Sequence, residues 1–232
     1  MNDGARARDI QAREVWDQYW SSKKTKGGLL YDAIAVVYRR VLIRPSLDRF
    51  LRAHFKKGSE VLHAGSGSGQ VDADIKSYLK ITALDISPNA LEIYQRENGP
   101  NSHVILGSIF QIQLPDNSMD GVYNLGVMEH FSETEIILIL NEFRRVMRPD
   151  GKLVLFWPPK FGSSVLFFKI LTLFFAKVLG KPDVKFHPEE TCRLRSRQHA
   201  AELLQQAGFK IVEYSFGPRD LFTYAVVVAR KA

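Results

Sequence analysis

The sequence predicts an α/β protein in which helices cover both faces of a doubly wound, mainly parallel sheet. After residue 58, short apolar segments alternate with helical ones, a pattern typical of buried parallel strands. A glycine-rich loop directly follows the first apolar segment. The chain has 232 residues, 45% of them hydrophobic, which is enough for one domain of this kind with a sizeable core.

The first 57 residues are predicted to form a helical cap. Apolar residues recur with helical spacing in Ile10–Trp20. After a basic loop at Lys23–Gly28, two further helices are expected at Leu29–Leu42 and Ser46–Phe55. This region holds 13 Lys and Arg against 6 Asp and Glu, and so accounts for the whole net charge of +7. Its charge suits an anionic ligand or lipid, or belongs to solvated helix faces.

Residues 58–232 are predicted to form the main domain. The strand candidates are Glu60–Ala64, Ile81–Asp85, His103–Leu106, Gly121–Asn124 and Lys152–Trp157. The helix candidates between them are Gln70–Leu79, Pro88–Glu97 and Glu133–Val146. Two last strands, Lys210–Phe216 and Phe222–Ala229, flank the turn at 217–220 and predict an antiparallel hairpin.

The loop after the first strand predicts a nucleotide-like ligand. Alternate glycines in Gly65–Gly69 let the backbone turn sharply and let a ligand approach it closely. We expect this loop to open the helix at Gln70–Leu79, whose free N–H groups favour a polar or anionic group. Asp85 ends the next strand, where a carboxylate can accept hydrogen bonds from both ribose hydroxyls. The third glycine of nicotinamide-binding loops would stand at Gln70, so the spacing favours adenosylmethionine.

Four later segments resemble motifs of the class I S-adenosylmethionine-dependent methyltransferases, in the family's order. They are Leu114–Tyr123 (LPDNSMDGVY), Asn124–Phe131 (NLGVMEHF), Leu140–Leu153 (LNEFRRVMRPDGKL) and Leu203–Phe209 (LLQQAGF). The resemblance covers residues 58–157 and 196–230. It implies a Rossmann-like sheet of seven strands in the order 3-2-1-4-5-7-6, with the last strand antiparallel. It also implies a methyltransferase whose cofactor is S-adenosyl-L-methionine.

The cofactor site implied by the resemblance lies at the carboxyl ends of the strands, where open parallel sheets bind ligands. Its expected members are His63, Gly65, Ser66, Gly67, Asp85, Ile86, Ser108, Ile109, Asn124, Leu125 and Gly126. By resemblance, the backbone of 65–67 contacts the methionine end of the cofactor and Asp85 holds the ribose. Residues 86 and 109 enclose the adenine, and residues 124–126 face the sulfonium and amino group.

Two of these residues depart from the family's pattern. His63 stands where the family usually has an acidic residue, which would help to order the loop and favour the cationic cofactor. Ser108 stands where the family often has Asp, and a serine accepts a weaker, uncharged hydrogen bond from the adenine amino group. These departures keep a non-catalytic S-adenosylmethionine-binding protein open as an alternative.

The sequence identifies no catalytic residue with certainty and no metal site. A sulfonium leaves as a neutral group, so alignment of the nucleophile supplies much of the rate. A base matters only when the acceptor has to lose a proton, and Glu129–His130 is the best-placed pair for that role. Alternatively, His130 caps or packs against the following helix. Trp16 and Trp20 either line a lid or pack the cap together, and Arg44 either reaches the cofactor carboxylate or is a surface residue.

An apolar insertion at 161–195 follows the fifth strand. Within its segment 164–180, Lys169 and Lys177 argue against a membrane span, because each would cost about 2.5–3.5 kcal/mol near the bilayer centre. The segment fits an amphipathic helix, which would serve as a lid over an apolar acceptor pocket, as an interfacial membrane helix or as a dimer contact.

The predicted function is therefore methyl transfer to a hydrophobic small-molecule or lipid-like acceptor, with a soluble polar acceptor as the alternative. A single cysteine and a polar first segment predict a cytoplasmic protein, with peripheral membrane contact through 164–180 as a further option. The aromatic-basic signature of RNA-binding domains is absent from the sequence, so no nucleic-acid partner is expected. The oligomeric state is not predicted.

Overall fold

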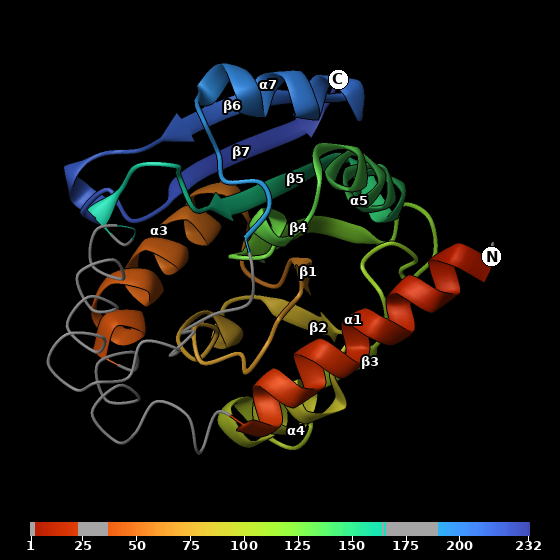
Figure 1. Cartoon of the computed structure of the whole chain (residues 1–232). Helices are drawn as coiled ribbons and strands as arrows, with labels where there is room; N and C mark the ends of the chain where they lie inside the picture. The colour runs from red at the N-terminus through yellow and green to blue at the C-terminus, as the bar shows by residue number, and fades with distance from the viewer. Residues whose placement is uncertain (1–2, 23–36, 164, 166–189) are drawn as a thin grey trace, which may run out of the picture.

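The structure is a computed structural model that describes residues 3–22, 37–163, 165 and 190–232. One seven-stranded sheet forms its centre, in the order β3-β2-β1-β4-β5-β7-β6 (Figure 1). The strands are β1 (Glu60–Ala64), β2 (Lys80–Asp85), β3 (His103–Leu106), β4 (Met119–Leu125), β5 (Met147–Trp157), β6 (Phe209–Ser215) and β7 (Ala225–Lys231). This is the order that the resemblance implied, so the predicted fold class is confirmed.

The first five strands are parallel and β7 is reversed. Val61 of β1 pairs with Gly121 of β4 in parallel register. Val227 of β7 pairs antiparallel with Leu155 of β5 and with Tyr214 of β6. The predicted hairpin of the last two strands therefore forms, and β7 lies between β5 and β6.

The last strand begins at Ala225, later than the predicted Phe222. Leu221 and Phe222 have positive φ angles of 48° and 55°, which no extended strand has. The Phe222 amide donates a hydrogen bond to the Gly217 carbonyl oxygen at 3.0 Å, so these residues close the turn instead.

The helices lie on both faces of the sheet. They are α1 (Asp3–Ser22), α3 (Arg44–His54), α4 (Pro88–Asn98), α5 (Glu133–Val146) and α7 (Arg197–Gln206). Alternate residues of β5 enter different hydrophobic clusters: Leu155 packs with residues of α5 and α7, whereas Val154 packs with residues of α3. This period-2 alternation is what a strand covered on both sides requires.

The predicted helix at Gln70–Leu79 is wrong. This segment forms successive turns and only a short 3₁₀ helix, η2 (Ile75–Ser77). The Asp72 amide donates to the Gly69 carbonyl oxygen at 3.0 Å, and the Ile75 amide donates to the Asp72 carbonyl oxygen at 3.1 Å, which is a three-residue spacing. The Asp72 side chain points inward and is completely buried, so tertiary hydrogen bonds have replaced helical geometry. The glycine loop therefore does not open an α-helix.

Helix α1 lies along α4, at the side of the sheet where β2 and β3 lie (Figure 1). Its Asp17 accepts hydrogen bonds from the Ser87 hydroxyl at 2.7 Å and from the Asn89 amide nitrogen at 3.1 Å. Because Ser87 is the N-cap residue of α4, Asp17 ties the N-terminal helix to the loop that follows Asp85.

Several expectations fall outside the described residues. They concern the loop at 23–28, most of the helix predicted at 29–42 and the apolar segment 164–180, of which only residue 165 is described. The described end of the second predicted helix runs into η1 (Arg39–Ile43), a short π-helical turn that leads directly into α3. Within the described ranges, the helices are too short or too polar to cross a bilayer.

Candidate functional site

The loop after β1 has a backbone that excludes most side chains. Gly67 has φ +52°, and a Cβ on it would lie 2.6 Å from Cζ2 of Trp20 in α1. Gly69 has φ +62°, and a Cβ there would lie 2.2 Å from the Tyr94 ring. These approaches are closer than a carbon contact allows, so α1 and α4 both pack onto the glycine loop itself.

Asp85 is the carboxylate that orders this loop. It is 7% exposed at the end of β2. Its Oδ2 accepts from the Gly67 amide at 2.8 Å and its Oδ1 from the Ser87 amide at 2.9 Å. Burial raises the pKa of Asp85, while these backbone hydrogen bonds lower it. Because a carboxylate oxygen can accept more than one hydrogen bond, both oxygens can still receive a ligand hydroxyl.

His63 differs from the other expected site residues, because its side chain takes part in a buried network behind the loop. It is 1% exposed and stacks on Tyr123 at a ring-centroid distance of 4.2 Å. Its Nδ1 lies 2.7 Å from Asp72 Oδ2. Asp72 also accepts hydrogen bonds from the hydroxyls of Tyr94 at 2.9 Å and Tyr123 at 2.8 Å. Asp72 thus brings a carboxylate to the residue that stands where the family usually has one.

The sequence analysis missed Asp72. A signal was available, because Asp72 stands within a segment whose apolar residues, Val71, Ile75 and Leu79, recur every four positions. All three are buried as that spacing predicts. An acidic residue next to such a buried stripe needs hydrogen-bond donors, and His63 is a donor at the preceding strand.

Two buried polar atoms at the strand ends lack hydrogen-bond partners among the described residues: Ser66 Oγ in the loop and Asn124 Oδ1 in β4. Asn124 is completely buried, and its Nδ2 donates to the Ala64 carbonyl oxygen at 2.8 Å. Buried polar atoms in proteins are rarely left unpaired. Both are able to accept hydrogen bonds, so a ligand with amino or hydroxyl donors fits here.

The remaining expected cofactor residues also lie at the carboxyl ends of the strands. Ile86 follows β2, Ser108 and Ile109 follow β3, Leu125 ends β4 and Gly126 follows it. All five are half-buried. The Ser108 hydroxyl accepts a hydrogen bond from the Phe110 amide at 3.3 Å and so shapes the turn after β3. Gly65, where the loop begins, has φ +71°.

Glu129 lies in η3 (Met128–His130), directly after β4, and is 4% exposed. Its main-chain oxygen accepts from the amides of Thr191 at 2.6 Å and Cys192 at 2.9 Å, which fastens the end of the insertion to this turn. A Cβ on Gly126 would lie 3.4 Å from Glu129 Oε1. Glu129 Oε2 is buried and has no hydrogen-bond partner within the described ranges. Burial raises the pKa of Glu129 to about 8.

The aromatic residues of α1 border the same region. The Trp16 ring packs edge-on against the His130 ring at a centroid distance of 4.9 Å. Trp20 contacts the glycine loop at Gly67. Arg44, by contrast, forms an ion pair with Asp74 at 3.0 Å. Trp20 therefore lies against the glycine loop, and Trp16 packs against His130 in the turn after β4.

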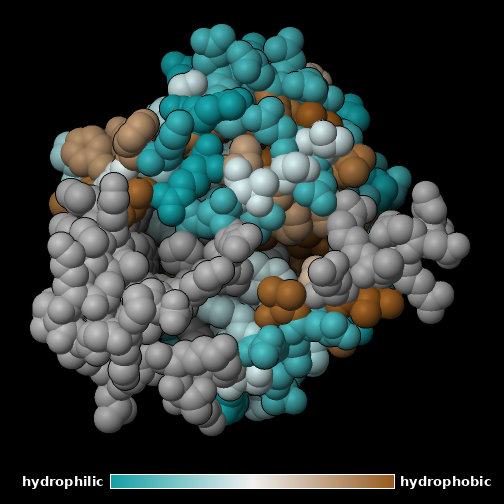
Figure 2. Space-filling model, viewed as in Figure 1, coloured by the Kyte–Doolittle hydropathy of each residue, from teal (hydrophilic) through white to brown (hydrophobic). Residues whose placement is uncertain are grey.

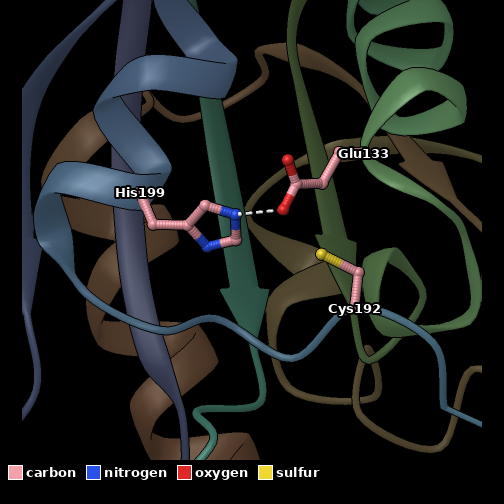
Figure 3. A group of neighbouring side chains, drawn as sticks. All are labelled: Glu133, Cys192 and His199. Atoms are coloured by element: carbon pink, nitrogen blue, oxygen red, sulfur yellow. Dashed lines mark hydrogen bonds and ion pairs between the residues drawn. The ribbon is translucent and has the colours of Figure 1, made fainter.

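A second cluster of reactive side chains lies between α5 and α7. Glu133, Cys192 and His199 bring potential metal-binding atoms within 4.8 Å of one another (Figure 3). The Glu133 carboxylate already accepts from His199 Nε2 at 3.1 Å and pairs with Arg195 at 2.7 Å. Burial raises the pKa of the Cys192 thiol, which disfavours the thiolate that a metal needs. The ion pairs explain this cluster without a metal, and the expectation of no metal site stays a prediction.

Comparisons with known proteins agree with this arrangement. A family model described as a methyltransferase domain matches residues 62–155. The chain is 34% identical over 122 residues to malonyl-[acyl-carrier protein] O-methyltransferase of Serratia marcescens, covering 52% of this chain and 45% of that protein. It is 26% identical over 224 residues to demethylmenaquinone methyltransferase of Geobacillus stearothermophilus, covering 84% of this chain and 94% of that protein. The chain thus spans less than half of the Serratia enzyme but nearly all of the Geobacillus one.

Solved structures show the same fold. The Burkholderia thailandensis 1,6-didemethyltoxoflavin-N1-methyltransferase, with bound S-adenosylhomocysteine, has 19% identity and a TM-score of 0.65, covering 100% of this chain and 91% of that one. Magnesium protoporphyrin IX methyltransferase from Synechocystis PCC 6803 has 17% identity and a TM-score of 0.66, covering 96% and 99%. Strand order, family model and curated relatives agree on a class I S-adenosylmethionine-dependent methyltransferase: residues 62–155 match the methyltransferase domain, and the cofactor of this class is S-adenosyl-L-methionine.

Proposed function

We propose that the protein transfers a methyl group from S-adenosylmethionine to a hydrophobic small-molecule or lipid-like acceptor. The observation that carries this proposal is the position of Trp16 and Trp20, two large apolar side chains beside His130 and the glycine loop. Bound S-adenosylmethionine supplies a methyl group attached to a positively charged sulfur, which becomes a neutral thioether. Aromatic walls favour an apolar acceptor and exclude water from the reacting atoms.

For the cofactor, we propose the residues at the carboxyl ends of β1 to β4. Asp85 would accept from the ribose hydroxyls, because both its oxygens are held in place by backbone amides and keep acceptor capacity. The buried Ser66 Oγ and Asn124 Oδ1 would accept from donors of the methionine end. Ile86 and Ile109 would enclose the adenine, and Ser108 would accept from its amino group. His63 would act indirectly, through Asp72, on the shape of the loop.

An exposed apolar patch further supports the choice of a hydrophobic acceptor. It consists of Phe161, Phe216, Leu221 and Phe222, and Phe161 is 78% exposed. The rings of Phe216 and Phe222 contact each other with centroids 5.3 Å apart. The Ser163 amide donates a hydrogen bond to the Phe222 carbonyl oxygen. Apolar atoms gather at this corner of the molecule in Figure 2. A patch of this kind beside the start of the insertion favours contact with an apolar partner.

The relatives' names point the same way. The Geobacillus relative is named for demethylmenaquinone and the Serratia relative for malonyl-[acyl-carrier protein]. We propose that segment 164–180 covers the acceptor side as a lid or reaches a membrane surface. Flotation with anionic liposomes, comparing the full chain with a variant lacking 164–180, separates the two. Equal recovery in the soluble fraction would remove the membrane surface and leave the lid or a dimer contact.

The function itself is tested by calorimetry followed by an acceptor screen. S-adenosylmethionine and S-adenosylhomocysteine should both bind, and NAD should not. Labelled cofactor is then offered with paired acceptors that differ in one apolar chain, such as a prenylated and an unprenylated phenol. Preferential labelling of the apolar member supports the proposal. Faster labelling of the polar member would contradict it, and binding without transfer to any acceptor would favour a non-catalytic protein.

A further inference from the structure

One buried carboxyl oxygen beside the predicted methyl-transfer position is left without a hydrogen bond by the described residues. Glu129 Oε2 is buried and lacks a hydrogen-bond partner within the part of the chain that the structure describes. We propose that Glu129 is the general base of the reaction and that the acceptor carries a weakly acidic hydroxyl, a phenol or an enol, whose proton moves to Glu129 Oε2. This inference rests on the proposed function and adds the class of acceptor to it.

The position of Glu129 is the first argument. Gly126 directly follows β4, in the segment that we expect to face the sulfonium of the cofactor. A Cβ on Gly126 would lie 3.4 Å from Glu129 Oε1 and 3.5 Å from the Tyr224 hydroxyl oxygen. The carboxyl and the phenol therefore both border the same residue at the end of β4. A base has to lie within hydrogen-bond reach of the proton that it removes, and a ligand held against Gly126 would lie next to the Glu129 carboxyl.

The surroundings of Glu129 are the second argument. His130 of the same turn has its Nε2 3.9 Å from Glu129 Oε1, and its ring packs against Trp16. Across the turn, the charge of Arg193 would favour ionisation of Glu129, but Arg193 forms an ion pair with Glu190, which opposes it. Tyr224 contributes a neutral hydroxyl, because burial raises its pKa well above the usual value, an effect that Tyr38 strengthens and Arg39 weakens.

Among the charged groups that the structure describes, no uncompensated cation therefore holds Glu129 in its charged form. Burial dominates and raises the pKa of Glu129 to about 8. A carboxyl group with a pKa near the working pH is charged often enough to accept a proton and basic enough to hold it. An ordinary glutamate, with a pKa of about 4.3, would be a weak base for a phenol.

The proposed step moves one proton and one methyl group. The acceptor O–H bond breaks, the proton goes to Glu129 Oε2, and the electron pair stays on the acceptor oxygen. That oxygen forms the new bond to the methyl carbon while the carbon–sulfur bond breaks, and the electron pair of the broken bond stays on the sulfur as a neutral thioether. Glu129 starts charged and ends neutral, and it returns its proton to water when the product leaves. Protonation removes the unpaired charge from the buried site, and the neutral carboxyl can then donate a hydrogen bond.

The first test needs neither the acceptor nor turnover. Infrared difference spectra of the wild type, Glu129→Gln and the control Glu92→Gln are recorded with S-adenosylhomocysteine between pH 6 and 10. Glu92 is an exposed carboxylate of α4. The wild type and the control should show a protonated carboxyl band that disappears with a midpoint near pH 8, and Glu129→Gln should lack it. A band unchanged in Glu129→Gln, or a wild type without a protonated carboxyl band at pH 6, would overturn the proposal.

The second test uses lipophilic phenols of decreasing pKa as acceptors. Glu129→Gln should lower kcat by about 10²–10⁴-fold for a phenol that is protonated at neutral pH. It should have little effect for a nitrophenol that is already ionised, whereas a merely structural role would lower both rates alike. Wild-type rates in Glu129→Gln with all phenols would refute the base. Failure of S-adenosylhomocysteine to bind would instead refute the proposed function, so the two failures are distinguishable.

Discussion

Asp72 and Glu129 are both buried carboxyl groups near β4, but their surroundings differ. Asp72 is completely buried, and His63, Tyr94 and Tyr123 bring three hydrogen-bonding groups to it. Glu129 is almost as buried, yet Oε2 has no partner among the residues described. Buried carboxyl oxygens are usually given hydrogen-bond donors by the fold, as those of Asp72 are. The difference indicates that Asp72 maintains the structure, whereas Glu129 is left available for a ligand.

The largest expected effect concerns Asp72. Asp72→Ala removes the shared acceptor and leaves three buried groups unpaired, so we expect the free energy of unfolding to fall by about 3–5 kcal/mol. Urea unfolding followed by circular dichroism measures this loss. The control is Asp74→Ala, because Asp74 is 61% exposed in its pair with Arg44 and such surface pairs contribute about 0–1 kcal/mol. Equal losses in the two variants would contradict a structural role specific to Asp72.

A double-mutant cycle extends this test to His63. His63→Asp alone places a second carboxylate against Asp72, and like charges in a buried site repel each other. Combining it with Asp72→Ala returns a single carboxylate to the network and should recover part of the stability. We expect a coupling energy of about 1–3 kcal/mol. If the losses of unfolding free energy in the two single variants simply add up in the double variant, His63 and Asp72 are not coupled. They would then not act as a pair in place of the family's usual acidic residue.

The next effect is a pH-dependent stability that comes from Glu129. Its folded-state pKa, about 8, lies above the ordinary carboxyl value, so the folded protein holds a proton that the unfolded chain loses. Its contribution to stability is therefore complete below about pH 4, falls as the pH rises, and is lost above about pH 8. Glu129→Gln should remove this slope and be more stable than the wild type at pH 9, since each unit by which burial raises the folded-state pKa costs about 1.4 kcal/mol once the carboxyl is charged.

Thermal or urea unfolding at pH 5, 7 and 9 checks this prediction, with Glu92→Gln as the matched exposed variant. A variant that is less stable than the wild type at pH 9 would mean that Glu129 makes structural hydrogen bonds. That result would remove the contrast with Asp72.

Asp85 is intermediate between the two carboxyl groups, because it has both structural and ligand-binding capacity. It orders the loop through the Gly67 and Ser87 amides and keeps acceptor capacity on both oxygens. Asp85→Asn should weaken S-adenosylhomocysteine binding by about 10–100-fold, since a hydrogen bond to a charged group contributes about 1.5–3 kcal/mol. Calorimetry measures the affinity, and Glu129→Gln serves as the comparison, with an affinity close to that of the wild type. An unchanged affinity in Asp85→Asn would remove it from the cofactor site.

The sequence predicted the sheet well because local patterns determine it. Strands such as β1 and β3 are short apolar segments, and α5 begins where Ser132 and Glu135 form a capping box. The helix at 70–79 was predicted wrongly because its apolar spacing is real but Asp72 turns inward to partners 9, 22 and 51 residues away. No local pattern reports such distant donors.

The candidate site was predictable to a similar extent. Motif positions located Asp85 and Asn124 at the strand ends, as found. The same positions put His63 among the expected cofactor residues, but they did not indicate that its ring is buried and stacks on Tyr123. The burial of Glu129 and its unpaired oxygen could not be read from the sequence. Only the folded structure brings Thr191 and Cys192 to the turn that contains Glu129.

The smallest expected effect separates the two departures from the family's pattern. His63 is compensated by Asp72, whereas Ser108 accepts a hydrogen bond from the Phe110 amide in a turn that an aspartate can form equally well. Ser108→Asp should therefore keep the turn and give the adenine amino group a charged acceptor. Charged acceptors form stronger hydrogen bonds, so we expect S-adenosylhomocysteine to bind about 3–10-fold more tightly, or about 0.7–1.4 kcal/mol. Ser108→Ala should bind slightly more weakly. If Ser108→Asp binds no better than the wild type, position 108 does not meet the adenine, and the departure at Ser108 has no bearing on cofactor affinity.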